Sequence, residues 1–242
     1  MLQLDHLVIA AATLADGAAW CERLFGITPP TGGQHAFMGT HNLLFSIASV
    51  RFPKAYAEII AIDPAGKAPE RPRWFGLDEP ALQQALQDGP QLIHWVARTN
   101  DIHAANALLR TAGIEPGAVL DAERATPRGL LRWQIGLRAD GRRLFGGALP
   151  TLIEWGDVHP SVARPPSNVQ LQQLQLRGVP EAIAAALGSV DGIAHATDAA
   201  GDPFPALRAT LDGPRGTVHL SAPSGSEPAP SSANPTRHES TR

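Results

Sequence analysis

Four side chains have the residue types and positions that could bind a metal ion or move a proton. His6 and His94 each interrupt a short apolar segment that is typical of a buried strand, and Glu58 and Glu154 each interrupt a later one. Burying such groups without partners costs several kcal/mol, and a shared metal ion removes that cost. Two imidazoles and two carboxylates suit one divalent ion, such as Ni, Co, Zn, Mn or Fe, with positions left for water or substrate.

The elements that must position these side chains occur twice in the same predicted order. Residues 1–63 read as a strand, a helix and three strands, and residues 91–160 repeat this βαβββ order. The first and last strands of such a unit lie side by side, so each histidine can lie next to its glutamate on the concave face of a sheet. The sequence therefore predicts one site shared by both units, in which Glu58 and Glu154 approach one another.

A third, shorter unit with the order βαββ is predicted over residues 167–222. It has Gln173 where the first two units have histidine, and His219 where they have glutamate. Without a ligand pair it is expected to be structural. It would cover an open edge of the sheet or extend the concave face, which we call the cup. Residues 223–242, rich in serine and proline, have nothing to bury and are predicted to be disordered.

Strand alternation predicts further side chains that line the concave face as a substrate site. In the first unit, Asn42 and Ser46 lie on the strand face that does not pack on the helix. In the second unit, the apolar residues of one strand share a face, so Arg132 and Gln134 are expected to line the cup from the other. Arg132 could bind an anionic substrate group there, or serve as a surface residue.

The connection between the two units, residues 64–90, is long and rich in proline and charge. Loops of this length in compact domains are usually functional or act as linkers. Trp74, in its middle, could contribute to substrate binding as part of a lid over the site, or fill the core beneath the connection.

Composition and charge exclude several classes of function. The chain has 242 residues, 43% of them hydrophobic, and a net charge of −3, which gives no basic field to attract nucleic acid. No run reaches the roughly 18 apolar residues of a spanning helix, so no membrane partner is expected. Asp5 and His6 interrupt any secretory signal and the single cysteine, Cys21, excludes an internal disulfide, which together favour a cytoplasmic location.

The motifs that carry these side chains resemble those of a known family. They are Leu-Asp-His-Leu-Val at 4–8, Gly-Thr-His-Asn at 39–42, Tyr-Ala-Glu-Ile-Ile at 56–60, Trp-Phe-Gly-Leu-Asp at 74–78, Leu-Ile-His-Trp-Val at 92–96 and Leu-Ile-Glu-Trp at 152–155. Over about residues 1–220 the chain resembles the vicinal oxygen chelate superfamily and, within it, glyoxalase-like domain proteins. The resemblance implies an α+β fold, in which tandem βαβββ units form a cupped mixed sheet with helices outside. It also implies that one metal ion is held at the centre of the cup by His6, Glu58, His94 and Glu154.

The function that this resemblance implies is that of a metal-dependent lyase, isomerase or epimerase acting on a small substrate with vicinal oxygens. A metal-bound carboxylate, Glu154 or Glu58, would take the proton next to a carbonyl. The alternatives are a metal-free protein that binds a small molecule, as resistance-type members do, and an Fe(II) dioxygenase, which normally has two histidines and one carboxylate. The fourth ligand argues against the dioxygenase. Two units in one chain can complete a site, so a homodimer is allowed but not required.

Overall fold

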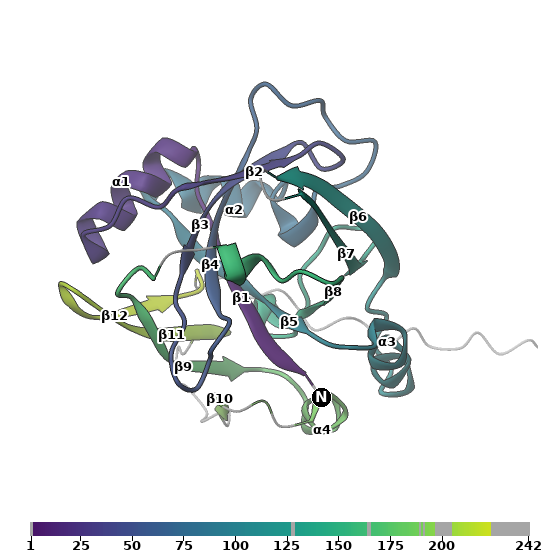
Figure 1. The fold of residues 1–242 in the computed structure, drawn as a ribbon. Coiled ribbons are helices and arrows are strands. Elements are labelled where there is room, and N and C mark those ends of the chain that lie inside the picture. Colours follow the sequence, from purple (N-terminus) through teal and green to yellow (C-terminus); the bar gives the residue numbers. More distant parts are fainter. Residues whose placement is uncertain are drawn as a thin grey trace, which may run out of the picture.

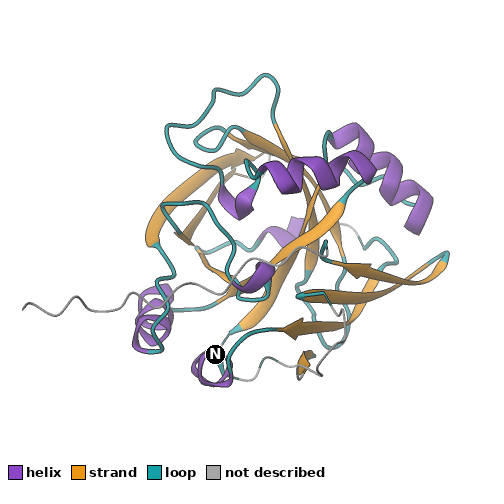
Figure 2. Ribbon diagram, turned by 180° about the vertical axis from the view of Figure 1, so that it is seen from behind, coloured by secondary structure: helices purple, strands orange, loops and turns teal. Residues whose placement is uncertain are grey.

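The computed structural model describes residues 2–126, 129–163, 166–188, 190, 192–196 and 205–223 (Figure 1). Its strands form a sheet of eight, in the order β2-β3-β4-β1-β5-β8-β7-β6, and a sheet of four, in the order β10-β9-β11-β12. The larger sheet is strongly curled, and α1 and α3 lie outside it (Figures 1 and 2). The predicted α+β class with a cupped mixed sheet is confirmed. Apart from Pro223, the tail predicted to be disordered lies outside the described residues.

The first unit forms one half of the eight-stranded sheet. Its elements are β1 Gln3–Ala10, α1 Leu14–Phe25, β2 Thr31–His35, β3 Thr40–Ser46 and β4 Tyr56–Ile62. Helix α1 begins where the Thr13 side chain accepts a hydrogen bond from the Asp16 backbone N–H, and it ends at Gly26 in the left-handed conformation. Strand β1 pairs in parallel with β4, so the first and last strands of the unit are neighbours.

The second unit forms the other half. Its elements are β5 Gln91–Arg98, α3 Ile102–Thr111, β6 Ala118–Thr126, β7 Gly129–Leu137, the 3-10 helix η3 Phe145–Gly147 and β8 Thr151–Trp155, followed by η4 Pro160–Ala163. The connection before it contains η1 Trp74–Gly76, α2 Pro80–Ala85 and η2 Leu86–Asp88. Strand β5 pairs in parallel with β8 and antiparallel with β1, so the two units meet at the centre of the sheet.

The remaining elements differ from the predicted third unit. They are β9 Gln170–Arg177, α4 Glu181–Leu187, β10 Ile193–Ala196, β11 Leu207–Gly213 and β12 Gly216–Ser221. Here the first strand, β9, pairs in parallel with β10 and antiparallel with β11, whereas β1 and β5 pair in parallel with the last strands of their units. These strands form the separate four-stranded sheet, with Gln173 opposite Thr210 and Thr210 opposite His219. Among the described residues these strands form a sheet of their own, and their apolar side chains belong to the core on the outer face of the larger sheet.

Apolar side chains lie on both faces of the curled sheet. On the outer face, Leu7, Ile9 and Trp95 of the central strands belong to one core with side chains of α1, α3 and the four-stranded sheet. The apolar residues of the four-stranded sheet therefore find their partners on this outer face. Inside the cup, a second cluster contains Val8 and Val96 of the same strands. Because most of the cup interior is apolar, its few polar side chains have few partners other than one another.

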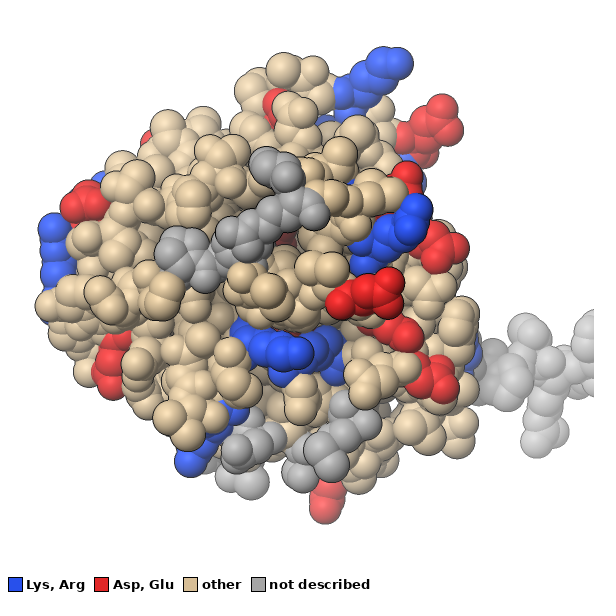
Figure 3. Space-filling view, in the orientation of Figure 1, with Lys and Arg blue, Asp and Glu red and all other residues tan. Residues whose placement is uncertain are grey.

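The surface drawn in Figure 3 carries basic and acidic side chains next to one another, so no field of one sign covers this face. No helix of the described residues is long and apolar enough to cross a membrane.

The packing of α1 on β4 depends on the absence of a side chain at Gly17. A Cβ atom there would lie 2.4 Å from Ile59 Cγ2, well inside contact distance. We expect Gly17→Val to lower the free energy of unfolding by about 1–3 kcal/mol, because the added methyl groups force the helix off the sheet. Ala15→Val, on the exposed side of the same helix, is the control, with an expected loss of about 0.5 kcal/mol or less. Urea unfolding measures both, and equal losses would contradict the close approach.

Candidate functional site

The first unit brings His6 and Glu58 together inside the cup. In the pairing of β1 with β4, His6 lies opposite Tyr56 and Glu58 lies opposite Val8, so both side chains leave the sheet on the same face. His6 Nε2 lies 3.5 Å from Glu58 Oε2, and the two residues are only 5% and 6% exposed. They form a buried ion pair when His6 is protonated.

Asp5, which is not among the predicted site residues, fixes the orientation of the His6 ring. Its fully buried carboxylate lies 2.7 Å from His6 Nδ1. The Trp155 indole N–H donates to the same carboxylate at 2.9 Å, and His159 Nε2 lies 2.9 Å from it. These two partners follow Asp5 by 150 and 154 residues, so no local pattern in the sequence could reveal the contacts.

Hydrogen bonding overrides burial in setting the pKa values of these three groups. Burial alone would lower the pKa of His6, but hydrogen bonds to Asp5 and Glu58 raise it to about 9. Burial would raise the pKa of Glu58, but its contact with His6 lowers it to about 2. Burial would also raise the pKa of Asp5, but hydrogen bonds with His159 and His6 hold it well below its ordinary value. At neutral pH the site therefore contains an imidazolium between two carboxylates.

Two further polar side chains of the first unit surround Glu58. The Asn42 Nδ2 group donates to Glu58 Oε1 at 2.5 Å, and Asn42 Oδ1 accepts from the Gly33 backbone N–H at 2.8 Å. His35 Nε2 lies 4.0 Å from Glu58 Oε1, and burial lowers the pKa of His35 to about 4, which keeps it neutral. Ser46, predicted to line the site, accepts instead from the Ala48 backbone N–H at the end of its own strand.

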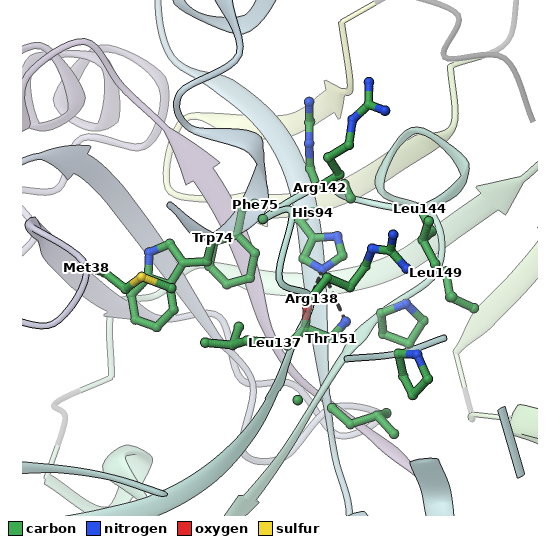
Figure 4. Close-up of a pocket in the computed structure, with 16 residues that line it drawn as sticks. Met38, Trp74, Phe75, His94, Leu137, Arg138, Arg142, Leu144, Leu149 and Thr151 are labelled. Atoms are coloured by element: carbon green, nitrogen blue, oxygen red, sulfur yellow. Dashed lines mark hydrogen bonds between the residues drawn. The ribbon is translucent and has the colours of Figure 1, made fainter. Parts of the chain in front are cut away.

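Trp74 and Phe75 fill the cup between the two units. The rings stack with centroids 5.4 Å apart, and they contact His35 at 4.8 Å and His94 at 5.2 Å respectively. Phe75 has a φ of 57°, an uncommon conformation for a bulky residue. These two rings line both the cavity at Glu58 and a separate pocket at His94, where Phe75 lies beside the His94 ring (Figure 4).

His94, in this second pocket, is held by partners of its own unit. Its Nδ1 atom lies 3.0 Å from the Gly147 carbonyl oxygen, and the Thr151 backbone N–H donates to Nε2 at 3.1 Å. These contacts assign the proton of the neutral ring to Nδ1. Burial, and then the nearby Arg143, lower the pKa of His94 to about 3.

Thr151 occupies in the second unit the position that Glu58 occupies in the first. Glu58 lies opposite the residue two places after His6, and Thr151 lies opposite the residue two places after His94. The Thr151 hydroxyl lies 3.0 Å from His94 Nε2, just as the Glu58 carboxylate lies next to His6. The second unit therefore has a neutral His–Thr pair where the first has a charged His–Glu pair.

Glu154 lies on the opposite face of the sheet, so the prediction that it joins Glu58 in the cup is wrong. It follows Thr151 by three residues in a strand whose side chains alternate, which turns it outward. Its Oε2 atom accepts a hydrogen bond of 2.8 Å from the Ile102 backbone N–H, at the start of α3. This carboxylate satisfies a helix N-terminus.

Arg132 and Gln134 also face outward, contrary to the prediction. Gln134 lies opposite Glu154 in the β7–β8 pairing. Arg132 Nε lies 3.4 Å from Glu123, and the Gln134 amide donates to Asp121 at 2.9 Å, both on the outer side of β6. The apolar residues of β7 were expected to pack away from the cup, but they point into it, where Trp133 and Ile135 belong to the apolar cluster.

The residues present do not fit the predicted four-ligand metal centre. Glu154 lies on the far face, and His94 lines a different pocket from the His6–Glu58 pair. Both nitrogens of His94 already have protein partners. Among the described residues, no three or more His, Cys, Asp or Glu side chains are grouped so that they could hold an ion.

We expect Glu154→Gln to lower the stability of the protein only slightly. The change removes a negative charge from the N-terminus of α3, which is worth about 0.3–1 kcal/mol. Thermal unfolding measures this loss. A loss well above about 2 kcal/mol would contradict this role at the start of α3.

Comparisons with known proteins agree with the fold. Residues 4–190 match the family model of the glyoxalase-like domain. A hypothetical protein from Staphylococcus aureus is 18% identical, with a TM-score of 0.50 over 74% of this chain and 70% of that chain. No curated protein matches.

Two methylmalonyl-CoA epimerases are more distant. The one from Streptomyces coelicolor, in complex with 2-nitronate-propionyl-CoA, is 18% identical over 66% of this chain and 99% of its own, with a TM-score of 0.39. The one from Mycobacterium tuberculosis is 18% identical over 66% and 91%, with a TM-score of 0.37. The family match covers most of the chain and leads to one conclusion: the chain belongs to the glyoxalase-like domain family.

Proposed function

We propose that the protein is an acid–base enzyme, an isomerase, epimerase or lyase, that acts on a small substrate with adjacent oxygens. Glu58 is the base and His6 is the acid. The observation that carries this proposal is the buried His6–Glu58 pair, which lines a cavity in a cup that is otherwise mostly apolar. A buried, hydrogen-bonded charge pair that lines a cavity is more typical of a functional site than of a protein core.

The pair could move a proton as follows. Glu58 takes the proton from the carbon next to a carbonyl group, and the electrons of the C–H bond form a C=C bond while negative charge develops on the carbonyl oxygen. His6 Nε2 donates its proton to that oxygen. Once His6 is neutral it no longer depresses the proton affinity of Glu58, so each transfer favours the other. If Glu58 returns the proton to the former carbonyl carbon while the neutral His6 takes the proton of the other oxygen, the carbonyl and hydroxyl groups exchange places and the substrate is isomerised. If the proton returns to the other face of the original carbon while His6 takes back its own proton, that carbon is inverted.

Neighbouring side chains hold this pair in position. Asp5 accepts from His6 Nδ1, which directs Nε2 toward the cavity, and Asn42 holds one oxygen of Glu58 so that the other remains next to His6. Trp133 and Trp155 line the same cavity and limit its contact with water. The arrangement suits a substrate of a few carbon atoms.

The test is solvent exchange into small α-hydroxy carbonyl compounds. Hydroxypyruvate, hydroxyacetone and glycolaldehyde each have an acidic C–H next to a carbonyl group, and ¹H NMR in D₂O measures loss of that proton. We expect the protein to accelerate exchange of at least one of them beyond the buffer rate. Binding of these compounds without exchange would support the alternative of a metal-free binding protein.

His6, Glu58 and His94 all leave the sheet on the cup face, but His94 lines a different pocket and both of its nitrogens have protein partners, so these three side chains do not form one metal site. Two histidines and one carboxylate are the usual ligand set of Fe(II) dioxygenases, so the same geometry argues against that alternative and favours a reaction without a metal ion. Metal analysis, followed by exchange assays after chelation and after addition of Ni, Co, Zn, Mn or Fe(II), separates these cases. Oxygen uptake with a catechol tests the dioxygenase.

A further inference from the structure

Arg124 reaches into the cup from the second unit. It lies opposite Leu131 in the β6–β7 pairing, and both residues line the cavity that contains His6 and Glu58. Strands β6 and β2 are the two edges of the eight-stranded sheet. The Arg124 side chain covers β2 at Gly33, where a Cβ atom would lie 2.4 Å from Nη1. A residue from the far edge of the sheet thus completes the wall of the first unit's cavity.

This guanidinium has no partner in the part of the chain that the structure describes. No ion pair or hydrogen bond joins the Arg124 side chain to another described residue, and its Nε atom is buried without a hydrogen-bond acceptor. Other arginines near the cup have carboxylate partners: Arg73 lies 2.6 Å from Asp78, and Arg138 lies 2.5 Å from Asp140.

The nearest carboxylate in the cavity is already committed. Glu58 uses one oxygen for Asn42 and the other for His6. A partly buried guanidinium without a counter-ion is costly, and an anion that enters the cavity would remove that cost.

We propose that Arg124 binds the carboxylate of the substrate, so that the substrate class is small carboxylic acids that carry a carbonyl and a neighbouring hydroxyl group. This inference rests on the proposed function, since it places the reacting carbons next to Glu58 and His6. The planar guanidinium matches a carboxylate with two parallel hydrogen bonds, a geometry that lysine cannot reproduce. The missing side chain at Gly33 leaves the space in which the guanidinium lies.

Arg132 is a matched control on the same hairpin. It was the arginine predicted to bind an anion, but its side chain is 70% exposed on the outer face and is paired with Glu123. Substituting it changes the net charge by the same amount as substituting Arg124, without touching the cavity.

The probes are hydroxypyruvate and hydroxyacetone, which share the α-hydroxy ketone and differ by the carboxylate. Trp74, Trp133 and Trp155 line the cavity, so intrinsic fluorescence can follow binding. We expect the unsubstituted protein to prefer hydroxypyruvate by about ten-fold or more, the effect of a charge-assisted hydrogen bond. Arg124→Gln should reduce the preference to about two-fold or less, Arg124→Lys should retain part of it, and Arg132→Gln should leave it unchanged. Unaltered hydroxyacetone binding by the Arg124 variants shows that the cup is intact.

The inference is overturned if the unsubstituted protein has no preference, if neither probe binds, or if Arg124→Gln keeps the preference. Its failure can be told apart from that of the proposed function. If the preference for hydroxypyruvate depends on Arg124 but no proton exchange occurs, the anion site is supported and the proposed reaction is rejected. If exchange occurs but the preference does not depend on Arg124, the reaction is supported and the anion site is rejected.

Discussion

Replacing Glu58 by Gln is expected to slow proton exchange by about 10²- to 10⁴-fold, the usual contribution of a positioned general base. The amide has nearly the same shape and can still accept from Asn42, but it cannot take a proton from carbon. The rate of deuterium incorporation at C3 of hydroxypyruvate, measured at saturating concentration, gives the effect on the chemical step.

A shortened carboxylate provides the control for this substitution. Glu58→Asp keeps the charge that neutralises His6 but withdraws it by one methylene group, so we expect a rate between those of the unsubstituted protein and Glu58→Gln. Exchange by Glu58→Gln at the unsubstituted rate would show that another group is the base.

Replacing Asp5 by Asn is expected to lower the free energy of unfolding by about 3–5 kcal/mol, the range for breaking a buried charge pair. Asp5 is fully buried and serves three partners, the side chains of His6, Trp155 and His159. An amide cannot compensate the positive charge of His6, and its NH2 group is a donor where the carboxylate has an acceptor oxygen. Urea unfolding measures the loss. A loss below about 1 kcal/mol would mean that the cluster has little energetic weight.

The effect of this substitution should depend on pH in a defined way. His6 has a raised pKa, so its stabilisation is complete below its ordinary value of 6.5 and is lost as pH rises through about 9. Asp5 has a lowered pKa, so its stabilisation is present above its ordinary value of 3.8 and is lost as pH falls below it. The difference in stability between the unsubstituted protein and Asp5→Asn should therefore be largest near pH 5–6.5 and should shrink on both sides. A difference that is constant with pH would contradict the charged pairing.

The fold and the first half of the site follow from local sequence patterns. His6 and Glu58 are polar residues within otherwise apolar central strands, and the structure brings both together with Asn42 on one face. Such residues stand out because a buried strand has no other use for them. The βαβββ order fixes which strands are neighbours, so the pairing of β1 with β4 could be inferred before the structure.

Which side chains of the second unit face the cup depends on strand register, which the sequence does not determine. Strand side chains alternate with a period of two, so an offset of three residues moves a side chain to the other face. The repeat predicts Glu154 as the counterpart of Glu58, but in the structure Thr151 has that position. The same ambiguity reversed Arg132 and Gln134. Alternation identifies which residues share a face, but it does not say which face is the inside when the cup itself is apolar.

Contacts between distant segments account for the residues that were missed. Arg124 lies in the cavity because the sheet curls far enough for its side chain to reach from the edge strand β6 to Gly33 on the other edge strand, β2. The partners of Asp5 come from the end of the second unit. Neither contact has a local sequence pattern. Arg124 follows Glu123 directly, so once the strand register shows that Glu123 faces outward, alternation places Arg124 on the cup face.

The most direct test of the central claim compares Glu58→Gln and Glu154→Gln side by side in the hydroxypyruvate exchange assay. The claim is that Glu58 is the general base and that Glu154, its predicted counterpart in the second unit, has no part in the reaction. We expect Glu58→Gln to lose at least about 100-fold in exchange rate, and Glu154→Gln to stay within about two-fold of the unsubstituted protein. Equal losses in the two variants, or full activity in Glu58→Gln, would contradict it.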